Sequence, residues 1–221
     1  MSKKEIAKRY ILFIISLFFS ALGVAFTKHG ELGVSPISSI ANIMSYRFPF
    51  LSLGTWLIIW NCALLVGQIC ILHRKFQLVQ LLQIPLSFVF GWFTDFGMWL
   101  MSFIPANSYL MRLTMVAIGI IILSLGISLS VIADVIMNSG EAFVKAVSDT
   151  FRKDFGNVKI AFDVIYVLIA IALSLLFFDF RIVGTREGTI LSALLTGIVV
   201  KFFCNHLKDP INIALFHKST V

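Results

Sequence analysis

Six long apolar stretches constrain the fold of this chain more than any other feature of its sequence. They cover residues 10–27, 51–72, 79–104, 111–133, 160–178 and 189–204. A helix needs about 20 consecutive apolar residues to cross the hydrocarbon core of a bilayer. Continuous apolar stretches favour helices over the alternating strands of a membrane β-barrel. The sequence therefore predicts an all-α fold, a polytopic membrane helical bundle with six transmembrane helices.

The composition agrees with a membrane protein and leaves no room for a separate soluble domain. Hydrophobic residues make up 59% of the 221 residues and charged residues only 13%, about half the usual share. The net charge is +7, but the basic residues form no run that is interleaved with aromatic residues. We therefore expect no nucleic-acid partner. We expect a single membrane domain over residues 1–221 that contacts membrane lipids.

The distribution of Lys and Arg predicts the orientation of the chain. With a cytoplasmic N-terminus, the segments on the cytoplasmic side are residues 1–9, 73–78, 134–159 and 201–221. These segments hold 13 of the 18 Lys and Arg residues. Because cytoplasmic loops of membrane proteins carry an excess of Lys and Arg, we expect a multi-pass protein with both termini in the cytoplasm.

Two further segments, residues 34–46 and 138–150, are helical in pattern but too short and too polar to span a membrane. Ser35 can cap the first, and Pro36 suits its first helical position. Asn138 or Ser139 can cap the second. We predict two short helices, and the sequence leaves open whether they re-enter the membrane or lie at its surface.

A weak internal repeat relates two parts of the chain at an offset of about 103 residues. The aligned pairs include Gly23 with Gly126, Glu31 with Asp134, Ser35 with Asn138, Gly54 with Gly156, Asn61 with Asp163, and Gly91 with Gly197. The two structural repeats are residues 10–104 and 111–204. With three spans each, the repeats have opposite orientations in the membrane. An inverted 3+3 repeat with one short helix in each half is a recurring plan of secondary transporters.

Four strings of sequence carry a resemblance to a known family. They are GELGVSPISSI, LLQIPLSFVFGWFTDF, MNSGEAFVKAVSDTFRKDFGNVKIAFDV and GTREGTILSALLTGIVVKFF. From about residue 11 to residue 203, the chain resembles the YczE/YyaS/YitT family of bacterial integral membrane proteins. The resemblance implies a protein of the bacterial inner (plasma) membrane with a transporter-like character. It brings no substrate and no residue roles with it.

Polar residues in or beside the apolar stretches are the candidates for solute binding. An ionisable side chain at membrane depth costs about 2.5–3.5 kcal/mol and therefore marks function by default. The candidate substrate-binding residues are Glu31, Ser35, Ser38, Ser39, Asn42, Asn61, Asp95, Asp134, Asn138, Ser139, Glu141 and Asp163. Among them, Glu31, Asp95 or Asp134 is expected to carry a coupling proton or cation.

Several candidates have a structural alternative that the sequence leaves open. Asp95 can be an interfacial or paired structural carboxylate, and Asn61 can hydrogen-bond to another helix. The two acids that precede the short segments, Glu31 and Asp134, can be solvated loop residues. The polar stripe of residues 34–46, which begins at Ser35, can face water outside the membrane.

Two other candidates lie at the spacing of a helical ion pair. Asp163 follows Lys159 by four residues, and Glu141 precedes Lys145 by four residues. Such i, i+4 pairs form commonly on helix surfaces. Either carboxylate can therefore serve its own helix instead of a solute.

No motif of a known enzyme class is present, so we expect no enzymatic activity, no catalytic residue, no metal and no cofactor. The sequence predicts a secondary transporter or permease that moves a small polar or anionic solute by alternating access. One alternative is a substrate-binding membrane subunit of a multi-component importer. Another is a non-transporting membrane scaffold or regulator. The sequence also leaves a homo-oligomer open.

Overall fold

The computed structural model describes residues 3–153 and 155–213, and all regular structure within them is helical. The α-helices are α1 (Lys3–His29), α2 (Pro36–Arg47), α3 (Leu53–Leu72), α4 (Gln83–Met101), α5 (Tyr109–Ala133), α6 (Ser139–Phe151), α7 (Phe155–Phe177) and α8 (Glu187–Ile211). Two short 3-10 turns, η1 (His73–Lys75) and η2 (Leu78–Leu82), link α3 to α4. The predicted all-α fold and both predicted short helices are confirmed.

Six of the described helices are long and apolar enough to cross a membrane: α1, α3, α4, α5, α7 and α8. They coincide with the six predicted stretches, although α1 already begins at Lys3 and α8 continues to Ile211. The other two helices, α2 and α6, have 12 and 13 residues. At 1.5 Å per residue, each is about 20 Å long, which is less than the roughly 30 Å of a bilayer core.

Local signals set several of the helix ends. The Ser52 hydroxyl accepts a hydrogen bond from the Thr55 amide at 3.0 Å and so caps α3. Pro36 opens α2, where its missing amide proton leaves no bond unmade. Asp134 follows α5 in the left-handed region, with φ of 49°. A residue in this conformation ends a helix and redirects the chain, here toward α6.

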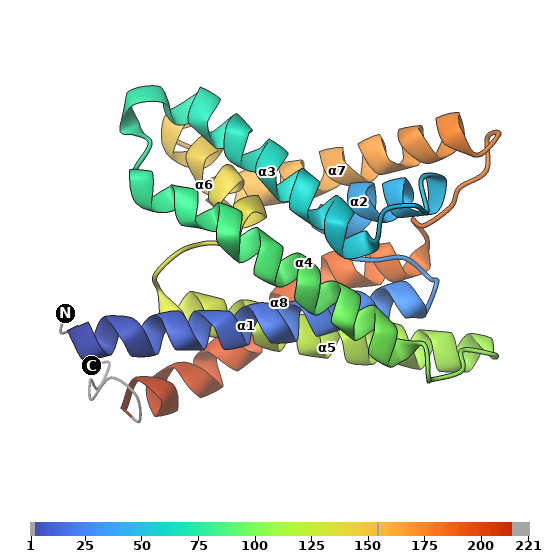
Figure 1. Cartoon of the computed structure of the whole chain (residues 1–221), viewed down its shortest axis with the longest axis horizontal. Coiled ribbons are helices and arrows are strands. Elements are labelled where there is room, and N and C mark those ends of the chain that lie inside the picture. The colour runs from blue at the N-terminus through green and yellow to red at the C-terminus, as the bar shows by residue number, and fades with distance from the viewer. Residues whose placement is uncertain (1–2, 154, 214–221) are drawn as a thin grey trace.

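The helices form a row of four beside a ring of four (Figure 1). In the row, α1 packs against both α4 and α5, and α8 packs against α5. In the ring, α3 and α7 each pack against both short helices, α2 and α6. An extensive contact between α3 and α4 and a smaller one between α2 and α8 join the row to the ring.

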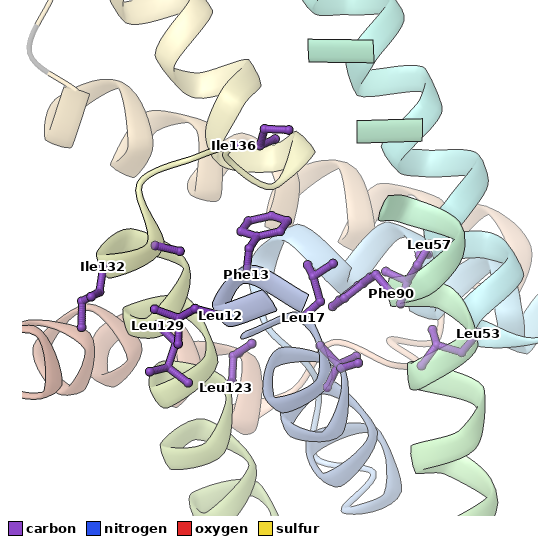
Figure 2. Packing of buried hydrophobic residues seen from close by; sticks show 14 residues of the cluster. Leu12, Phe13, Leu17, Leu53, Leu57, Phe90, Leu123, Leu129, Ile132 and Ile136 are labelled. Carbon is purple, nitrogen blue, oxygen red and sulfur yellow. The ribbon is translucent and has the colours of Figure 1, made fainter. Parts of the chain in front are cut away.

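Two apolar clusters hold this arrangement together. The larger cluster fills the space between α1, α3, α4 and α5 and includes Phe13, Leu57, Phe90 and Leu123 (Figure 2). The second lies inside the ring and includes Ile43, Leu64, Val144 and Phe162. Burial of these side chains supplies most of the packing between helices, whereas the outer faces of α7 and α8 stay apolar and exposed. Those outer faces contact membrane lipids.

The helices α1 and α5 cross with their backbones almost touching. A Cβ atom on Gly23 would lie only 2.5 Å from the Leu123 amide nitrogen. A Cβ on Gly126 would collide with Ser20, and one on Gly119 would lie 2.9 Å from the Gly23 carbonyl oxygen. Small residues allow such close approach between membrane helices. This crossing therefore fixes the centre of the row.

Candidate functional site

The two short helices begin next to each other, near the middle of the long axis of the molecule, and run toward opposite ends (Figure 1). The Ile37 side chain in the first turn of α2 packs on the backbone of Gly140 in the first turn of α6. The Cδ1 atom of Ile37 lies 2.9 Å from the position of a Cβ on Gly140. We call this meeting of two helix N-termini the junction. Because each N-terminus carries partial positive charge and free amide protons, the junction favours a polar or negatively charged group.

On the α2 side of the junction, polar side chains are buried and bonded mainly within their own helix. The Ser35 hydroxyl donates to the Ser38 oxygen at 3.1 Å, and the Ser39 hydroxyl donates to the Pro36 carbonyl at 2.6 Å. Ser38, Ser39 and Asn42 are at most 4% exposed. The alternative in which this polar stripe faces outside water is therefore wrong, because α3, α7 and α8 pack around α2 and these side chains are buried.

On the α6 side, two buried polar atoms lack a partner. The Asn138 side chain accepts a hydrogen bond from the Ser139 amide at 3.0 Å and so caps α6. The Ser139 hydroxyl has no hydrogen-bond partner although the residue is 1% exposed. One carboxylate oxygen of Glu141, Oε2, is also buried without a partner. An unpaired buried polar atom is costly, and a bound ligand or water can satisfy it.

Two amide side chains of α3 are buried in the bundle, and one of them contacts α6. Gln68 donates to the Ser139 carbonyl oxygen at 3.2 Å and exchanges hydrogen bonds of 3.1 Å with Gln83 of α4. Asn61 lies seven residues earlier on the same face of α3, about two helical turns away. Its Nδ2 group is buried and has no partner. Asn61 is thus a third unsatisfied polar group within the bundle.

A small cavity lies against the N-terminus of α6. Its volume is about 10 Å³, which is close to the space that one water molecule needs. Its lining combines the polar residues Gln83, Ser87, Asn138 and Ser139 with apolar side chains that include Phe13 and Leu17 of α1. The unpartnered Ser139 hydroxyl belongs to a residue that lines this cavity.

The N-terminus of α2 is closed by the first turn of α8. The Gly188 amide donates to the Leu32 carbonyl oxygen at 2.7 Å. Gly33 has φ of 113°, and a Cβ there would collide with Thr189, so only glycine fits. The Thr189 hydroxyl is buried at 1% exposure without a partner. The α2 side of the junction is thus sealed, whereas the α6 side has a cavity.

Asp95 lies away from the junction, at the N-terminus of α3. Its carboxylate accepts hydrogen bonds from the Ser52 hydroxyl at 2.5 Å and from the Gly54 amide at 2.8 Å. Gly54 is 14 residues before Gln68 on α3, about 21 Å along the helix. The geometry agrees with the alternative of a structural carboxylate, here one that caps a helix.

We expect Asp95→Ala to destabilise the protein by about 1 kcal/mol, because it removes the acceptor of the Gly54 amide and leaves only Ser52 to cap α3. Asp95→Asn keeps an acceptor for the Gly54 amide and should cost less. Thermal unfolding in one detergent compares the two variants. An equal loss of stability in both would contradict the capping role.

The two acids ahead of the short helices lie at the surface of the protein. Glu31 is exposed and forms an ion pair of 2.7 Å with Arg112 of α5. Asp134 is exposed at the C-terminal end of α5. Both residues have positive φ, 55° for Glu31 and 49° for Asp134. Their positions agree with the alternative of loop residues that shape the entry to each short helix.

Two predicted ion-pair spacings have different outcomes. Asp163 pairs with Lys159 at 2.5 Å, as the alternative for this residue predicted. Lys145 pairs instead with Asp149 at 3.3 Å, so the pairing of Glu141 with Lys145 is wrong. Glu141 thus remains without that local partner. Burial raises the pKa of its carboxyl group, an effect that the nearby Lys159 ammonium partly offsets and the Asp163 carboxylate adds to.

Lys28 is a site residue that the sequence pattern did not reveal. Its ammonium group donates to Asn42 Oδ1 at 2.5 Å and to the Ser45 hydroxyl at 3.2 Å, and lies 3.2 Å from the centre of the Tyr46 ring. The Asn42 amide also donates to the Gly184 carbonyl oxygen at 2.8 Å. Asn42 is thus held by the protein itself. No local signal connects residues that lie so far apart in the sequence.

The fold and the site define a multi-pass helical membrane protein with several buried polar groups that lack a partner. The chain belongs to a family of unknown function, DUF6198, which matches residues 7–205. It is also similar to the "Uncharacterized membrane protein YczE" of Bacillus subtilis (strain 168), with 26% identity over 98% of this chain and 95% of that protein. These comparisons confirm the resemblance to YczE. No solved structure matches the chain significantly.

Proposed function

We propose that the protein is a secondary transporter that moves a small polar or anionic solute across the bacterial plasma membrane. The observation that carries this proposal is the junction, where two helix N-termini meet beside unpartnered polar groups of Ser139 and Glu141. A solute that fits there gains hydrogen bonds that the protein alone leaves unmade. No enzymatic step is part of the proposal. In this proposal both termini lie in the cytoplasm, in keeping with the distribution of Lys and Arg.

The backbone supports an inverted repeat with one re-entrant helix in each half. The order of a long helix, a short helix and two long helices occurs twice along the chain. Ser35 before α2 has φ of −57° and ψ of 150°, and Asn138 before α6 has φ of −59° and ψ of 150°. The short helices run in opposite directions from the junction (Figure 1). Half-helices of this kind form the midplane sites of several transporters.

The two halves differ in a way that supports alternating access. In the first half, α3 and α4 pack tightly, and a Cβ on Gly91 would lie 2.7 Å from the Gly54 carbonyl oxygen. Gly197 of α8, which the repeat aligns with Gly91, has no atom within 4 Å of its Cβ position. In the proposed cycle the halves exchange these arrangements, and the side of the junction that is sealed changes with them.

A thermal-shift screen tests whether the junction binds a solute. Amino acids, carboxylates, nucleobases and vitamins are added to the purified protein, because a ligand that binds only the folded state raises its melting temperature. We expect a compound that stabilises the protein, and we expect Ser139→Ala to weaken its affinity at least tenfold, about 1.4 kcal/mol. Since the Ser139 hydroxyl has no partner, this variant should fold normally.

Ser102→Ala is the matched control, because the Ser102 hydroxyl bonds only to the backbone of its own helix end at Trp99. A ligand whose affinity is the same in both variants would place binding elsewhere. No stabilisation at millimolar ligand, with the protein folded, would count against a solute site. Uptake by the purified protein alone in liposomes separates a transporter from a subunit that needs an importer partner.

A further inference from the structure

The chemistry of the junction depends on the charge of Glu141. This residue is the third of α6, so its carboxylate belongs to the first helical turn, where the backbone amide groups have no partner within the helix. Its second oxygen, Oε2, is buried without any partner. An ionised carboxylate in this position has one buried oxygen without a protein partner, which disfavours the charged form.

The elements around α6 supply one cation near Glu141, and that cation is already engaged. On α7, Lys159 is paired with Asp163 at 2.5 Å. On α6 itself, Lys145 is paired with Asp149 and exposed. The helix α3 carries no charged side chain, and its titratable groups are the thiols of Cys62 and Cys70. On α2, which meets α6 end to end, the titratable groups are Tyr46 and Arg47 at the far end of the helix.

The other candidate acids are each satisfied by the protein or by water. Asp95 caps α3, and Asp163 is held by Lys159. Glu31 pairs with Arg112, and Asp134 is exposed. None of these four carboxylates has a buried, unpartnered oxygen. Glu141 is therefore the carboxylate whose proton has the largest effect on the charge at the junction.

We propose that Glu141 is the proton-binding site of the junction and carries the coupling proton of the transport cycle. This inference rests on the proposed transport function. The proton comes from water on the side to which the junction is open and binds Glu141 Oε2. It returns to water on the opposite side of the membrane after the two halves have exchanged their packing arrangements. A protonated Glu141 leaves the two N-termini uncompensated, so the solute that binds with the proton is an anion or carries a partial negative charge.

Infrared spectroscopy of the purified protein tests the proton site without any solute. We expect the carbonyl stretch of a protonated carboxyl group at neutral pH, and we expect this band to be lost in Glu141→Gln. Glu187→Gln is the matched control, because Glu187 also lies in a first helical turn but is paired with Arg186 at 3.2 Å. The control should keep the band. A band that persists in Glu141→Gln, or that disappears in Asp163→Asn instead, overturns the assignment.

The pH dependence of stability gives a second readout. A carboxyl group whose pKa is raised by folding stabilises the folded state below its unfolded pKa, and this contribution is lost as the pH rises through the folded pKa. We therefore expect the melting temperature of the native protein to fall as the pH rises above the usual range of a glutamate. Glu141→Gln should remove that fall, and Glu187→Gln should keep it. Equal pH profiles in all three proteins would overturn the proposal.

The two readouts separate this inference from the transport function. A protonated Glu141 together with no solute in the thermal-shift screen would uphold the proton site and count against transport. A solute whose binding needs Ser139, in a protein that shows no protonated Glu141, would uphold transport and remove Glu141 as the proton carrier.

Discussion

Gly23→Ala is expected to destabilise the protein severely, whereas Gly197→Ala should leave it at least as stable as the native chain. A Cβ on Gly23 would lie 2.5 Å from the amide nitrogen and 2.6 Å from the Cα of Leu123. Backbone atoms cannot rotate away, so α1 and α5 must separate. Overpacking of this kind costs about 1–3 kcal/mol or more. At Gly197 the added methyl meets nothing within 4 Å and gains up to about 1 kcal/mol of helix propensity.

The two variants are matched, because each adds one methyl group within a membrane helix. Their melting temperatures in the same detergent, and their yields of monodisperse protein, provide the comparison. We expect Gly126→Ala to behave like Gly23→Ala, since a Cβ there would collide with Ser20. Equal melting temperatures for Gly23→Ala and Gly197→Ala would show that α1 and α5 do not cross as described.

A disulfide between Ile160 and Gly197, each replaced by cysteine, is expected to form during the transport cycle and to abolish solute uptake. In the first half, the Cβ position of Gly91 lies 2.6 Å from a side-chain atom of Ile58. The repeat aligns Ile58 with Ile160 and Gly91 with Gly197. In this structure, however, Ile160 is 65% exposed, and no atom lies within 4 Å of the Cβ position of Gly197. A disulfide needs Cβ atoms about 3.5–4.5 Å apart, so it reports the exchanged arrangement.

The matched control is the pair Ile58→Cys and Gly91→Cys, which this structure already holds close together. Both pairs are placed in a chain without its native cysteines, Cys62, Cys70 and Cys204. A solute or a pH change that favours one arrangement should raise the yield of one disulfide and lower that of the other. An Ile160–Gly197 disulfide that never forms, beside complete cross-linking of the control, would contradict the exchange. A disulfide between two chains would identify this face as an oligomer interface.

The helices could be predicted from the sequence because their signals are local. Apolar runs of sufficient length located the six long helices, and Pro36 and Asn138 located the starts of the two short ones. These features depend on residues that are close together in the chain. The family resemblance has the same basis, since it was carried by short strings of sequence.

The site was predicted only in part, because its geometry depends on contacts between distant residues. Ser139 and Asn61 were candidates, and both have unpartnered polar groups inside the bundle. The cap that Asp95 gives to α3 joins residues 41 and 43 positions apart, and the bond between Gln68 and Ser139 spans 71 positions. No spacing rule reaches across such distances. Helical periodicity also assigned a solvent-facing alternative to α2, although the ring of helices buries it.

The crossing of α1 and α5 has a consequence for a chain of half this length. Gly23 lies against Leu123, and Gly126 lies against Ser20, so the same contact is made twice with the two partners interchanged. Such reciprocity is the hallmark of an interface between two identical subunits related by a two-fold axis. Under the proposed repeat, four helices like α1–α4, inserted into the membrane in both orientations, would bury this surface against a second copy. The whole chain then corresponds to a dimer of oppositely oriented subunits fused end to end, and the short loop between α4 and α5 is the point of fusion.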